Sequence, residues 1–284
     1  MLPAGTIRPS GPAEGMKRAI GGGGKVGRLE SVGCVLLHAA GSSPRALSGL
    51  EAWLADQGIR VLVPRLPMAV ATDDAQAGAP LRTHVAIARR ALELLAPGRR
   101  VVFGHSFGGL VALLALLDGA HADAAVLYEP VVLSVLDDGN RRDREARAWD
   151  RALVDHLEAR LKAGDPEDGV RRFIEAYNEV RWEALSPRAR ATIVGEAAAM
   201  RDLTQAVHHL PVPAARLRDL GTRILVMRGT RSPQVARRMA ANLSQVLPNV
   251  TVSILRDAGH MAPVLAPEVV GALMLAFLED ALQR

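Results

Sequence analysis

The residues best placed to do chemistry are Gly-His-Ser-Phe-Gly at 104–108, which have the G-x-S-x-G spacing of a nucleophile elbow. A β-branched run precedes this motif and a helical pattern of small and apolar residues follows it, so it lies at a strand-to-helix turn. Such a sharp turn brings backbone segments close together, and a Cβ atom at either glycine would clash. Ser106 would then project its hydroxyl from the edge of the sheet. The alternative is a glycine-rich turn without a chemical role.

The hydroxyl of Ser106 is a poor nucleophile at neutral pH and needs a base within hydrogen-bond reach. His260 is the best candidate, because it lies in the loop after the last predicted strand. Such loops of a parallel sheet lie at the same edge as the elbow. His105 is the rival base. Adjacent side chains at a sharp turn point away from each other, so we expect His105 to pack beside the elbow.

An oxyanion that develops during attack by a serine needs two backbone donors. The N–H group of Phe107, at the start of the helix after the elbow, is one of them. The second is expected from the loop after the strand at 34–38, where the N–H group of Ala40 is the best candidate. His38 ends that strand and is expected to order this loop.

The chain alternates short apolar runs with helical patterns, which predicts an α/β fold. Each predicted strand is a continuous apolar run, and such strands are buried on both faces of a mostly parallel, doubly wound sheet. Residues 137–220 break the alternation with helical patterns only, so we expect an all-helical cap inserted after the strand that ends at Tyr128. The predicted units are a flexible leader at 1–24, an α/β core at 25–136 and 221–284, and the helical cap at 137–220.

Composition and charge exclude several classes of protein. The 35 Lys and Arg residues exceed the 30 Asp and Glu residues, but the two signs are interleaved, which is typical of solvated helical faces rather than of nucleic-acid binding. No apolar run is long enough to span a membrane and no signal peptide is evident, so we expect a cytoplasmic protein. Cys34 is the single cysteine, which excludes an internal disulfide. No spacing typical of metal ligands occurs, and His208 and His209 are interpreted as surface residues.

These features together resemble the α/β-hydrolase fold superfamily, in its capped serine-hydrolase subclass. The resemblance is carried by the strand and loop at His38, the motif at 104–108, the helical insertion after Tyr128, and Gly259-His260 before a terminal helix. It covers about residues 30–284. It implies that Ser106 is the nucleophile of a catalytic triad, that His260 is its base, and that the reaction needs no cofactor.

The acid of the triad departs from the usual pattern of this superfamily. It usually follows the strand that is Ile224–Met227 here, in a Gly-x-x-Asp pattern, but this chain has Ser232 at that position. A serine cannot stabilise an imidazolium by charge. Ser232 is therefore interpreted as the N-cap of the helix that follows it.

Some members of the superfamily place the acid after the preceding strand, where this chain has Glu129. The chain order of Ser106, Glu129 and His260 then keeps nucleophile, acid and base in the usual sequence. We predict Glu129 as the acid, and a structural ion pair between Glu129 and an arginine is the alternative. Weaker candidates for the acid are Asp137, Asp138 and Asp257.

Aromatic side chains in the predicted cap bear on the kind of substrate. Phe173 and Tyr177 are four residues apart, on one face of a helix, and Trp182 follows them. They either pack the cap onto the core or line an apolar substrate pocket, to which Met261 and Phe107 would also contribute.

The resemblance implies a serine hydrolase that cleaves a carboxylic ester, lactone or thioester of a small apolar acyl compound. One alternative is a C–C bond hydrolase or lyase that uses the same three residues. Another is a non-catalytic ligand-binding member of the fold, which the serine at position 232 keeps open. The expected partner is a small-molecule substrate, with no nucleic acid and no membrane, and a homodimer is left open.

Overall fold

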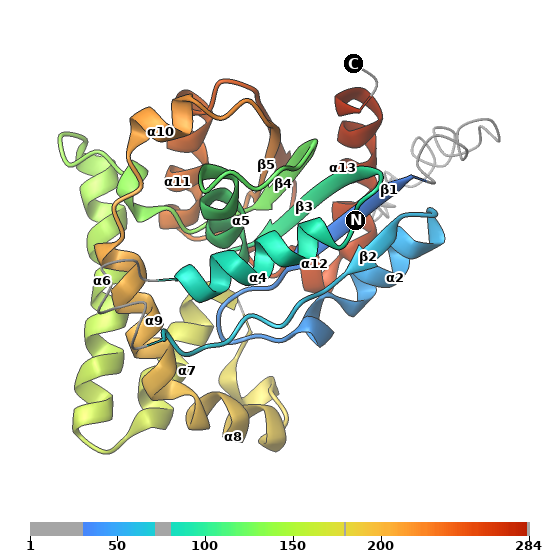
Figure 1. Ribbon diagram of the computed structural model, residues 1–284. Helices are drawn as coiled ribbons and strands as arrows, with labels where there is room; N and C mark the ends of the chain where they lie inside the picture. Colours follow the sequence, from blue (N-terminus) through green and yellow to red (C-terminus); the bar gives the residue numbers. More distant parts are fainter. Residues whose placement is uncertain (1–30, 72–80, 179, 283–284) are drawn as a thin grey trace, which may run out of the picture.

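The computed structural model describes residues 31–71, 81–178 and 180–282 of the chain. The leader predicted at 1–24 lies outside these described residues. Within them, one sheet carries helices on both faces, and further helices gather beyond one end of the sheet (Figure 1). No helix in the described ranges is both long and apolar enough to cross a membrane.

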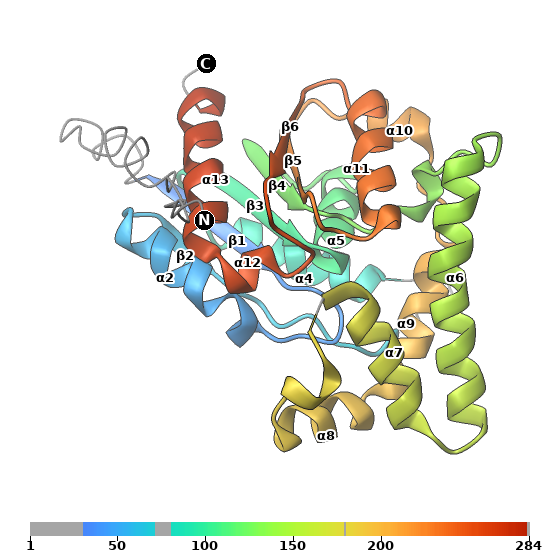
Figure 2. The same cartoon turned by 180° about the vertical axis from the view of Figure 1, so that it is seen from behind.

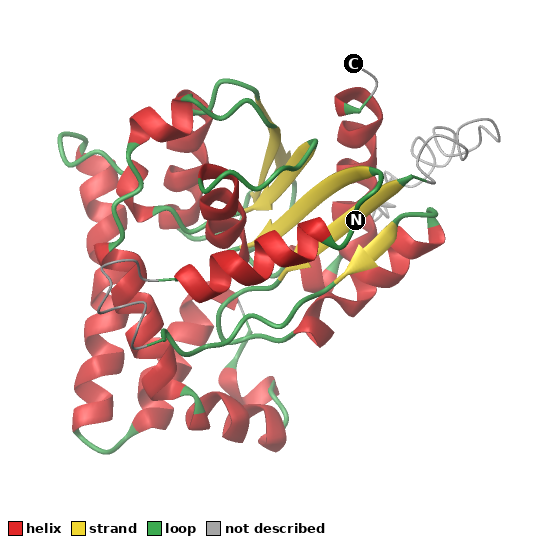
Figure 3. Cartoon of the chain, in the orientation of Figure 1, coloured by secondary structure: helices red, strands yellow, loops and turns green. Residues whose placement is uncertain are grey.

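The central sheet has its strands in the order β2-β1-β3-β4-β5-β6, and all neighbours are parallel (Figure 3). The strands are β1 (Val32–Leu37), β2 (Arg60–Leu62), β3 (Arg99–His105), β4 (Ala124–Tyr128), β5 (Arg223–Gly229) and β6 (Val250–Leu255). His105 lies opposite Tyr128, and Tyr128 lies opposite Met227. The carboxyl ends of β3, β4 and β5 therefore meet at one edge. The predicted doubly wound parallel sheet is confirmed.

Helices cover both faces of this sheet (Figure 2). On one face lie α4 (Arg82–Glu93), α5 (Phe107–Leu117) and α11 (Gln234–Val246), and on the other lie α2 (Ser48–Asp56) and α13 (Pro267–Ala281). Successive side chains of a strand point to opposite faces. In β4, Leu127 accordingly packs with the first group of helices and Tyr128 with the second. This two-sided burial is why the strands are continuous apolar runs in the sequence.

Between β4 and β5 the structure holds a helical insertion, residues 137–220. Its helices are α6 (Arg141–Lys162), α7 (Pro166–Asn178), α8 (Pro187–Gly195), α9 (Ala197–His209) and α10 (Ala214–Arg218). Helices α6, α7, α8 and α9 lie beyond the end of the sheet in both views (Figure 1, Figure 2). The remaining short helices are η2 (Pro44–Leu47), η3 (Leu133–Val135), η4 (Trp182–Ala184) and α12 (Ala262–Leu265).

One helix boundary inside the insertion differs from the sequence prediction. Helical patterns predict one helix over 186–200 and a shorter piece near 201–208, but α8 ends at Gly195 and α9 runs unbroken from Ala197 to His209. Glycine is a poor helix former because of its conformational freedom, and it ends the first helix here. The predicted break near residue 200 is wrong.

A buried polar cluster joins the insertion to the core. Asp143 on α6 is 1% exposed and accepts hydrogen bonds from Arg238 and Asn242, both on α11. Burial by itself would raise the pKa of Asp143, but the bonds from Arg238 and Asn242 outweigh it and hold that pKa below its ordinary value. The ionised carboxylate therefore stabilises the contact between α6 and α11.

We expect Asp143→Asn to lower the free energy of unfolding by about 3 kcal/mol, because it leaves the partly buried Arg238 without its charged partner. Urea denaturation followed by circular dichroism measures this change. Since the folded pKa of Asp143 is depressed, its stabilising effect is present above about pH 4, the range of an unfolded Asp, and is lost as the pH falls through the folded value. The difference in the free energy of unfolding between Asp143→Asn and the wild type should therefore become smaller as the pH falls below about 4.

The control for this variant is Glu145→Gln on the same helix, which breaks an exposed ion pair with Arg141. Exposed pairs contribute little, so we expect a change of about 0.5 kcal/mol or less. Equal effects of the two substitutions would contradict a special role for the buried pair.

Candidate active site

The turn between β3 and α5 has the backbone geometry of a nucleophile elbow. Ser106 has a φ of 55°, in the left-handed region that residues other than glycine rarely adopt. A Cβ atom on Gly104 would lie 2.5 Å from the carbonyl oxygen of Gly108, and one on Gly108 would lie 2.2 Å from that of Leu37. The predicted need for glycine at both positions is confirmed, and Ser106 stands at the apex of the turn.

Glu129 directly follows β4 and is completely buried, with a φ of 47°. The Nδ1–H group of His260 donates to Glu129 Oε2 over 2.8 Å. The other oxygen, Oε1, accepts from the N–H of Gly229 over 2.9 Å and from the hydroxyl of Ser232. The alternative of a structural ion pair with an arginine is wrong, because Glu129 pairs with His260 instead. Asp137, Asp138 and Asp257 are not the partners of His260.

Ser232 does not cap the helix that follows it. The N-cap position of α11 is Pro233, and no side chain accepts a capping hydrogen bond there. The hydroxyl of Ser232 is instead drawn to the buried carboxylate of Glu129, because a buried charge needs donors around it. The interpretation of Ser232 as a cap is wrong, because its hydroxyl bonds to the Glu129 side chain instead.

The loop that carries His260 is held from the neighbouring strand ends. The hydroxyl of Tyr128 donates to the carbonyl oxygen of Gly259 over 2.7 Å, and Nε2–H of His105 donates to that of His260 over 2.8 Å. A carbonyl only accepts, so the Nε2 atom of His105 carries a proton. Burial and the nearby His260 hold the pKa of His105 well below its ordinary value. His105 packs beside the elbow as predicted and anchors the histidine loop.

His38 orders the loop after β1. Its Nδ1–H donates to the carbonyl oxygen of Ala39 over 2.9 Å, and its Nε2 accepts from the N–H of Leu66 over 3.0 Å. These bonds fix the backbone immediately before Ala40. Phe107 is the first residue of α5, where N–H groups have no partner inside the helix. Ala40 and Phe107 both line the cavity that Ser106 lines.

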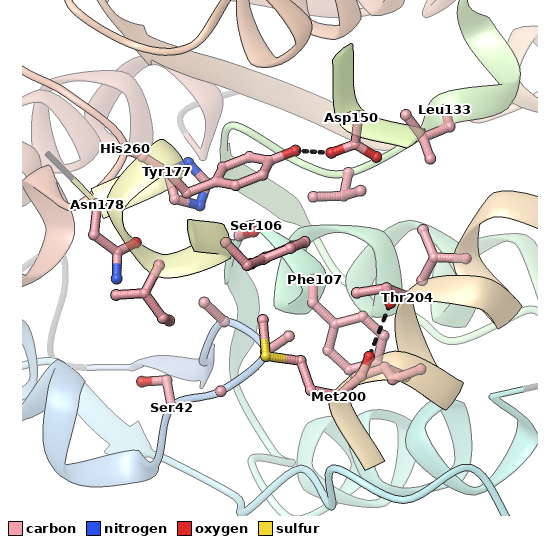
Figure 4. Close-up of a pocket in the computed structure, with 18 of the residues that line it drawn as sticks. Ser42, Ser106, Phe107, Leu133, Asp150, Tyr177, Asn178, Met200, Thr204 and His260 are labelled. Atoms are coloured by element: carbon pink, nitrogen blue, oxygen red, sulfur yellow. Dashed lines mark hydrogen bonds between the residues drawn. The ribbon is translucent and has the colours of Figure 1, made fainter. Parts of the chain in front are cut away.

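This cavity lies between the sheet edge and the helical insertion (Figure 4). Its volume is about 140 Å³. Most of its wall is apolar, and Ser106 and His260 both line it. Its other lining residues include Leu133, Asp150, Phe173, Tyr177, Met200, Leu203, Thr204, Val207, His208 and Met261.

Of the five side chains predicted for an apolar pocket, four line this cavity: Phe107, Phe173, Tyr177 and Met261. Phe173 stacks on Tyr177, and the Tyr177 ring lies 5.2 Å from the His260 ring. The prediction for Trp182 is wrong. Its ring is buried in an apolar cluster within the insertion, and its Nε1–H donates to Glu167 over 2.9 Å.

The sequence interpretation missed two polar residues of the cavity wall. Nε2–H of His208 donates to Oδ2 of Asp150 over 2.7 Å, and both side chains are nearly buried. The interpretation of His208 as a surface residue is wrong. The positions of these two residues in their helices could have indicated that they are buried. His208 follows Val207, a buried residue of α9, and Asp150 lies on the buried face of α6 with Ala146 and Leu153.

The sequence matches the alpha/beta hydrolase family over residues 34–273. The chain belongs to this family. Family membership makes the protein a hydrolase. A relative from Mesorhizobium japonicum, 2-(acetamidomethylene)succinate hydrolase, is 25% identical over 202 residues, which span 66% of this chain and 67% of that protein.

Solved structures of this fold resemble the chain along most of its length. MenH from S. aureus has a TM-score of 0.66 at 17% identity, over 89% of this chain and 95% of that protein. The esterase RhEst1 from Rhodococcus sp. ECU1013 has a TM-score of 0.62 at 19% identity, over 88% of this chain and 91% of that protein. Likeness at this identity establishes the shared fold.

No group of three or more His, Cys, Asp or Glu side chains within 31–71, 81–178 and 180–282 could hold a metal ion. The histidines of the site have other partners instead. His260 donates to Glu129, His105 to a carbonyl and His208 to Asp150.

The buried His105 makes the stability of the fold depend on pH. Its pKa in the folded protein lies well below that of an unfolded histidine, so below about pH 6.5 the unfolded chain binds a proton that the folded chain does not. The free energy of unfolding should therefore decrease as the pH falls from about 6.5, by up to about 1.4 kcal/mol per pH unit for one such group. His105→Gln, which keeps an N–H donor, should reduce this slope in urea denaturation between about pH 7 and about pH 5.

The control is His121→Gln, because the His121 side chain is 62% exposed. We expect this substitution to leave the slope at the wild-type value. A slope that is the same in all three proteins would show that His105 is not the group responsible.

Proposed function

We propose that this protein is a serine hydrolase that cleaves a carboxylic ester, lactone or thioester of a small, largely apolar acyl compound. Ser106 is the nucleophile, His260 the base and Glu129 the acid of its triad. The observation that carries this proposal is the buried hydrogen bond of 2.8 Å between His260 Nδ1 and Glu129 Oε2. His260 also lines the cavity that Ser106 lines.

The hydrogen bond to Glu129 determines which nitrogen of His260 can act as the base. A carboxylate accepts only, so Nδ1 of His260 carries the proton and Nε2 has the lone pair. In the proposed reaction Nε2 takes the proton of the Ser106 hydroxyl while the Ser106 oxygen attacks the carbonyl carbon. Glu129 then stabilises the imidazolium that forms, because its charge is buried and close.

The tetrahedral intermediate carries a negative charge on the former carbonyl oxygen, which we place against the N–H groups of Phe107 and Ala40. The imidazolium of His260 returns its proton to the leaving alcohol or thiol, and the C–O or C–S bond breaks to leave an acyl-Ser106 ester. A water molecule then gives a proton to His260 and attacks the acyl carbon. His260 returns that proton to the Ser106 oxygen as the bond between this oxygen and the acyl carbon breaks, which releases the acid and free Ser106.

The size and lining of the cavity support a small substrate. Its volume of about 140 Å³ is close to that of a protein cavity that holds benzene, roughly 150 Å³. Among the described residues, the lining includes no lysine or arginine. The relative from Mesorhizobium japonicum is named for a succinate derivative, and a succinate carries two carboxyl groups. A wall whose described residues include Asp150 but no Lys or Arg favours a different, less anionic substrate.

Replacement of Ser106 by alanine tests the nucleophile. We expect turnover of a short p-nitrophenyl ester to fall by at least about 1,000-fold, because the acyl-enzyme route is lost. A fluorophosphonate probe should label the wild type stoichiometrically and leave Ser106→Ala unlabelled. The matched control is Ser244→Ala on α11, whose hydroxyl donates to the carbonyl of Ala241 and should not affect labelling.

The same variants separate the alternatives. Labelling of Ser106→Ala as strong as that of the wild type would eliminate Ser106 as the nucleophile. A wild type that is neither labelled nor active on any ester would favour a non-catalytic member of the fold. Ser106-dependent turnover of β-diketones in preference to esters would favour a C–C bond hydrolase.

Replacement of Glu129 tests the acid. Glu129→Gln keeps the size of the side chain but removes the charge and offers His260 an amide, so kcat should fall by about 1,000- to 10,000-fold. Ser232→Ala removes one donor to Glu129 Oε1 and leaves the Gly229 N–H, so we expect a smaller loss, of roughly tenfold. Thermal denaturation of both variants checks that they are folded. Wild-type turnover by folded Glu129→Gln would place the acid elsewhere.

A further inference from the structure

Three polar side chains from three helices of the insertion meet in the wall of the largely apolar cavity, and Figure 4 shows two of them, Asp150 and Tyr177. Asp150 comes from α6, Tyr177 from α7 and His208 from α9. The side chains of Asp150 and His208 are only 7% and 6% exposed. The triad described above does not need this cluster.

The carboxylate of Asp150 is the centre of the cluster. The Tyr177 hydroxyl donates to its Oδ1, and Nε2–H of His208 donates to its Oδ2 over 2.7 Å. Burial, and then the nearby Asp150, raise the pKa of Tyr177 well above its ordinary value, so its hydroxyl stays protonated as a donor. A carboxylate has about four acceptor positions, so each oxygen keeps one after these two bonds.

The cluster differs from the packing contact that Asp143 makes. Asp143 lies on the same face of α6, seven residues earlier, and its oxygens accept from Arg238, from Asn242 and from the backbone of Asp137. That carboxylate joins the insertion to the core. Asp150 has two donors among the described residues, both from the insertion itself, and it lines the cavity.

The surroundings of Asp150 make its remaining acceptor positions selective. Leu133, Leu203 and Val207 line the cavity beside it and offer no hydrogen bonds from their side chains. An apolar group that excludes water from the carboxylate leaves these positions without a partner, which is unfavourable. A substrate group with an O–H or N–H can donate to them.

We propose that Asp150, held by Tyr177 and His208, forms a subsite that binds a hydrogen-bond donor, a hydroxyl or amide N–H, carried by the substrate. This inference rests on the proposed ester hydrolysis and specifies its substrate class. The substrate is apolar along most of its surface and has one donor group that projects into the helical insertion. Asp150 is then a specificity-determining residue of the reaction.

Pairs of esters that differ in a single donor group test this subsite. Two pairs place the donor on the acyl side: p-nitrophenyl 3-hydroxybutyrate against 3-methylbutyrate, and p-nitrophenyl N-acetyl-β-alaninate against 5-oxohexanoate. A third places it on the alcohol side: 2-hydroxyethyl butyrate against propyl butyrate. We expect the wild type to prefer the donor-bearing member of at least one pair by roughly 10- to 100-fold in kcat/KM.

The decisive variant is Asp150→Leu, which keeps the branched shape and removes the acceptors. The preference ratio should fall to about one. Both esters of a pair meet the same enzyme preparation, so the ratio does not depend on how much of the variant is folded. The matched control is Thr204→Val. Thr204 lines the same cavity, but its hydroxyl donates to the backbone carbonyls of Met200 and Arg201, so the ratio should stay at the wild-type value.

Binding to Ser106→Ala separates the subsite from the chemistry. Calorimetry with the intact esters should show the donor-bearing member bound more tightly, by a similar factor, and Ser106→Ala/Asp150→Leu should lose this difference. The binding comparison stands even if the wild type hydrolyses none of the esters, an outcome that would overturn the proposed function. Equal binding of both members of every pair, or a preference that survives Asp150→Leu, would overturn the subsite.

Discussion

The buried carboxylate of Glu129 is the interaction on which the arrangement of the site depends. It has no exposed surface, so both of its oxygens need donors. His260 donates a hydrogen bond to Oε2 of Glu129, and the Ser232 hydroxyl and the N–H of Gly229 donate to Oε1. These donors come from the last residue of β5, from the loop after it and from the loop after β6, while Glu129 directly follows β4. One carboxylate thus ties together the ends of three successive strands, and the position of the histidine follows from it.

Hydrogen bonds between neighbouring strand ends place the nucleophile beside this unit. The N–H of Ser106 donates to the carbonyl of Tyr128 over 2.9 Å, across the junction of β3 and β4. Tyr128 and His105 in turn bind the carbonyls of Gly259 and His260. The sheet edge therefore holds all three residues of the proposed triad by contacts of its own. The helical insertion adds the opposite wall of the cavity and lays the ring of Tyr177 against His260.

Helix α6 shows how one helix face can serve two purposes. Asp143 and Asp150 are both buried and lie seven residues apart on that face. The first meets Arg238 and Asn242 of α11, which fastens the insertion to the core. The second reaches the cavity, where its partners come from the insertion alone among the described residues. An aspartate on α6 therefore stabilises the contact with the core at position 143 and is a candidate substrate-binding group at position 150.

The sequence by itself determined the parallel α/β core, the elbow and the position of the carboxylate. Continuous apolar runs, paired glycines and a glutamate that ends a buried strand are local signals, because each follows from the burial or crowding of a single segment. Glu129 is predicted as the acid because some members of the superfamily that the chain resembles place their acid after this strand, and because a carboxylate that follows a buried strand needs a partner.

Only the tertiary structure decided which side chains meet across segments. Ser232 bonds to Glu129 rather than capping α11, and Trp182 packs inside the insertion rather than in the cavity. Asp150 and His208 meet although 58 residues separate them. The pattern of a helix shows which face is buried, but the partner of a polar group on that face depends on how the helices pack together. That packing is a property of the whole chain and cannot be read from one segment.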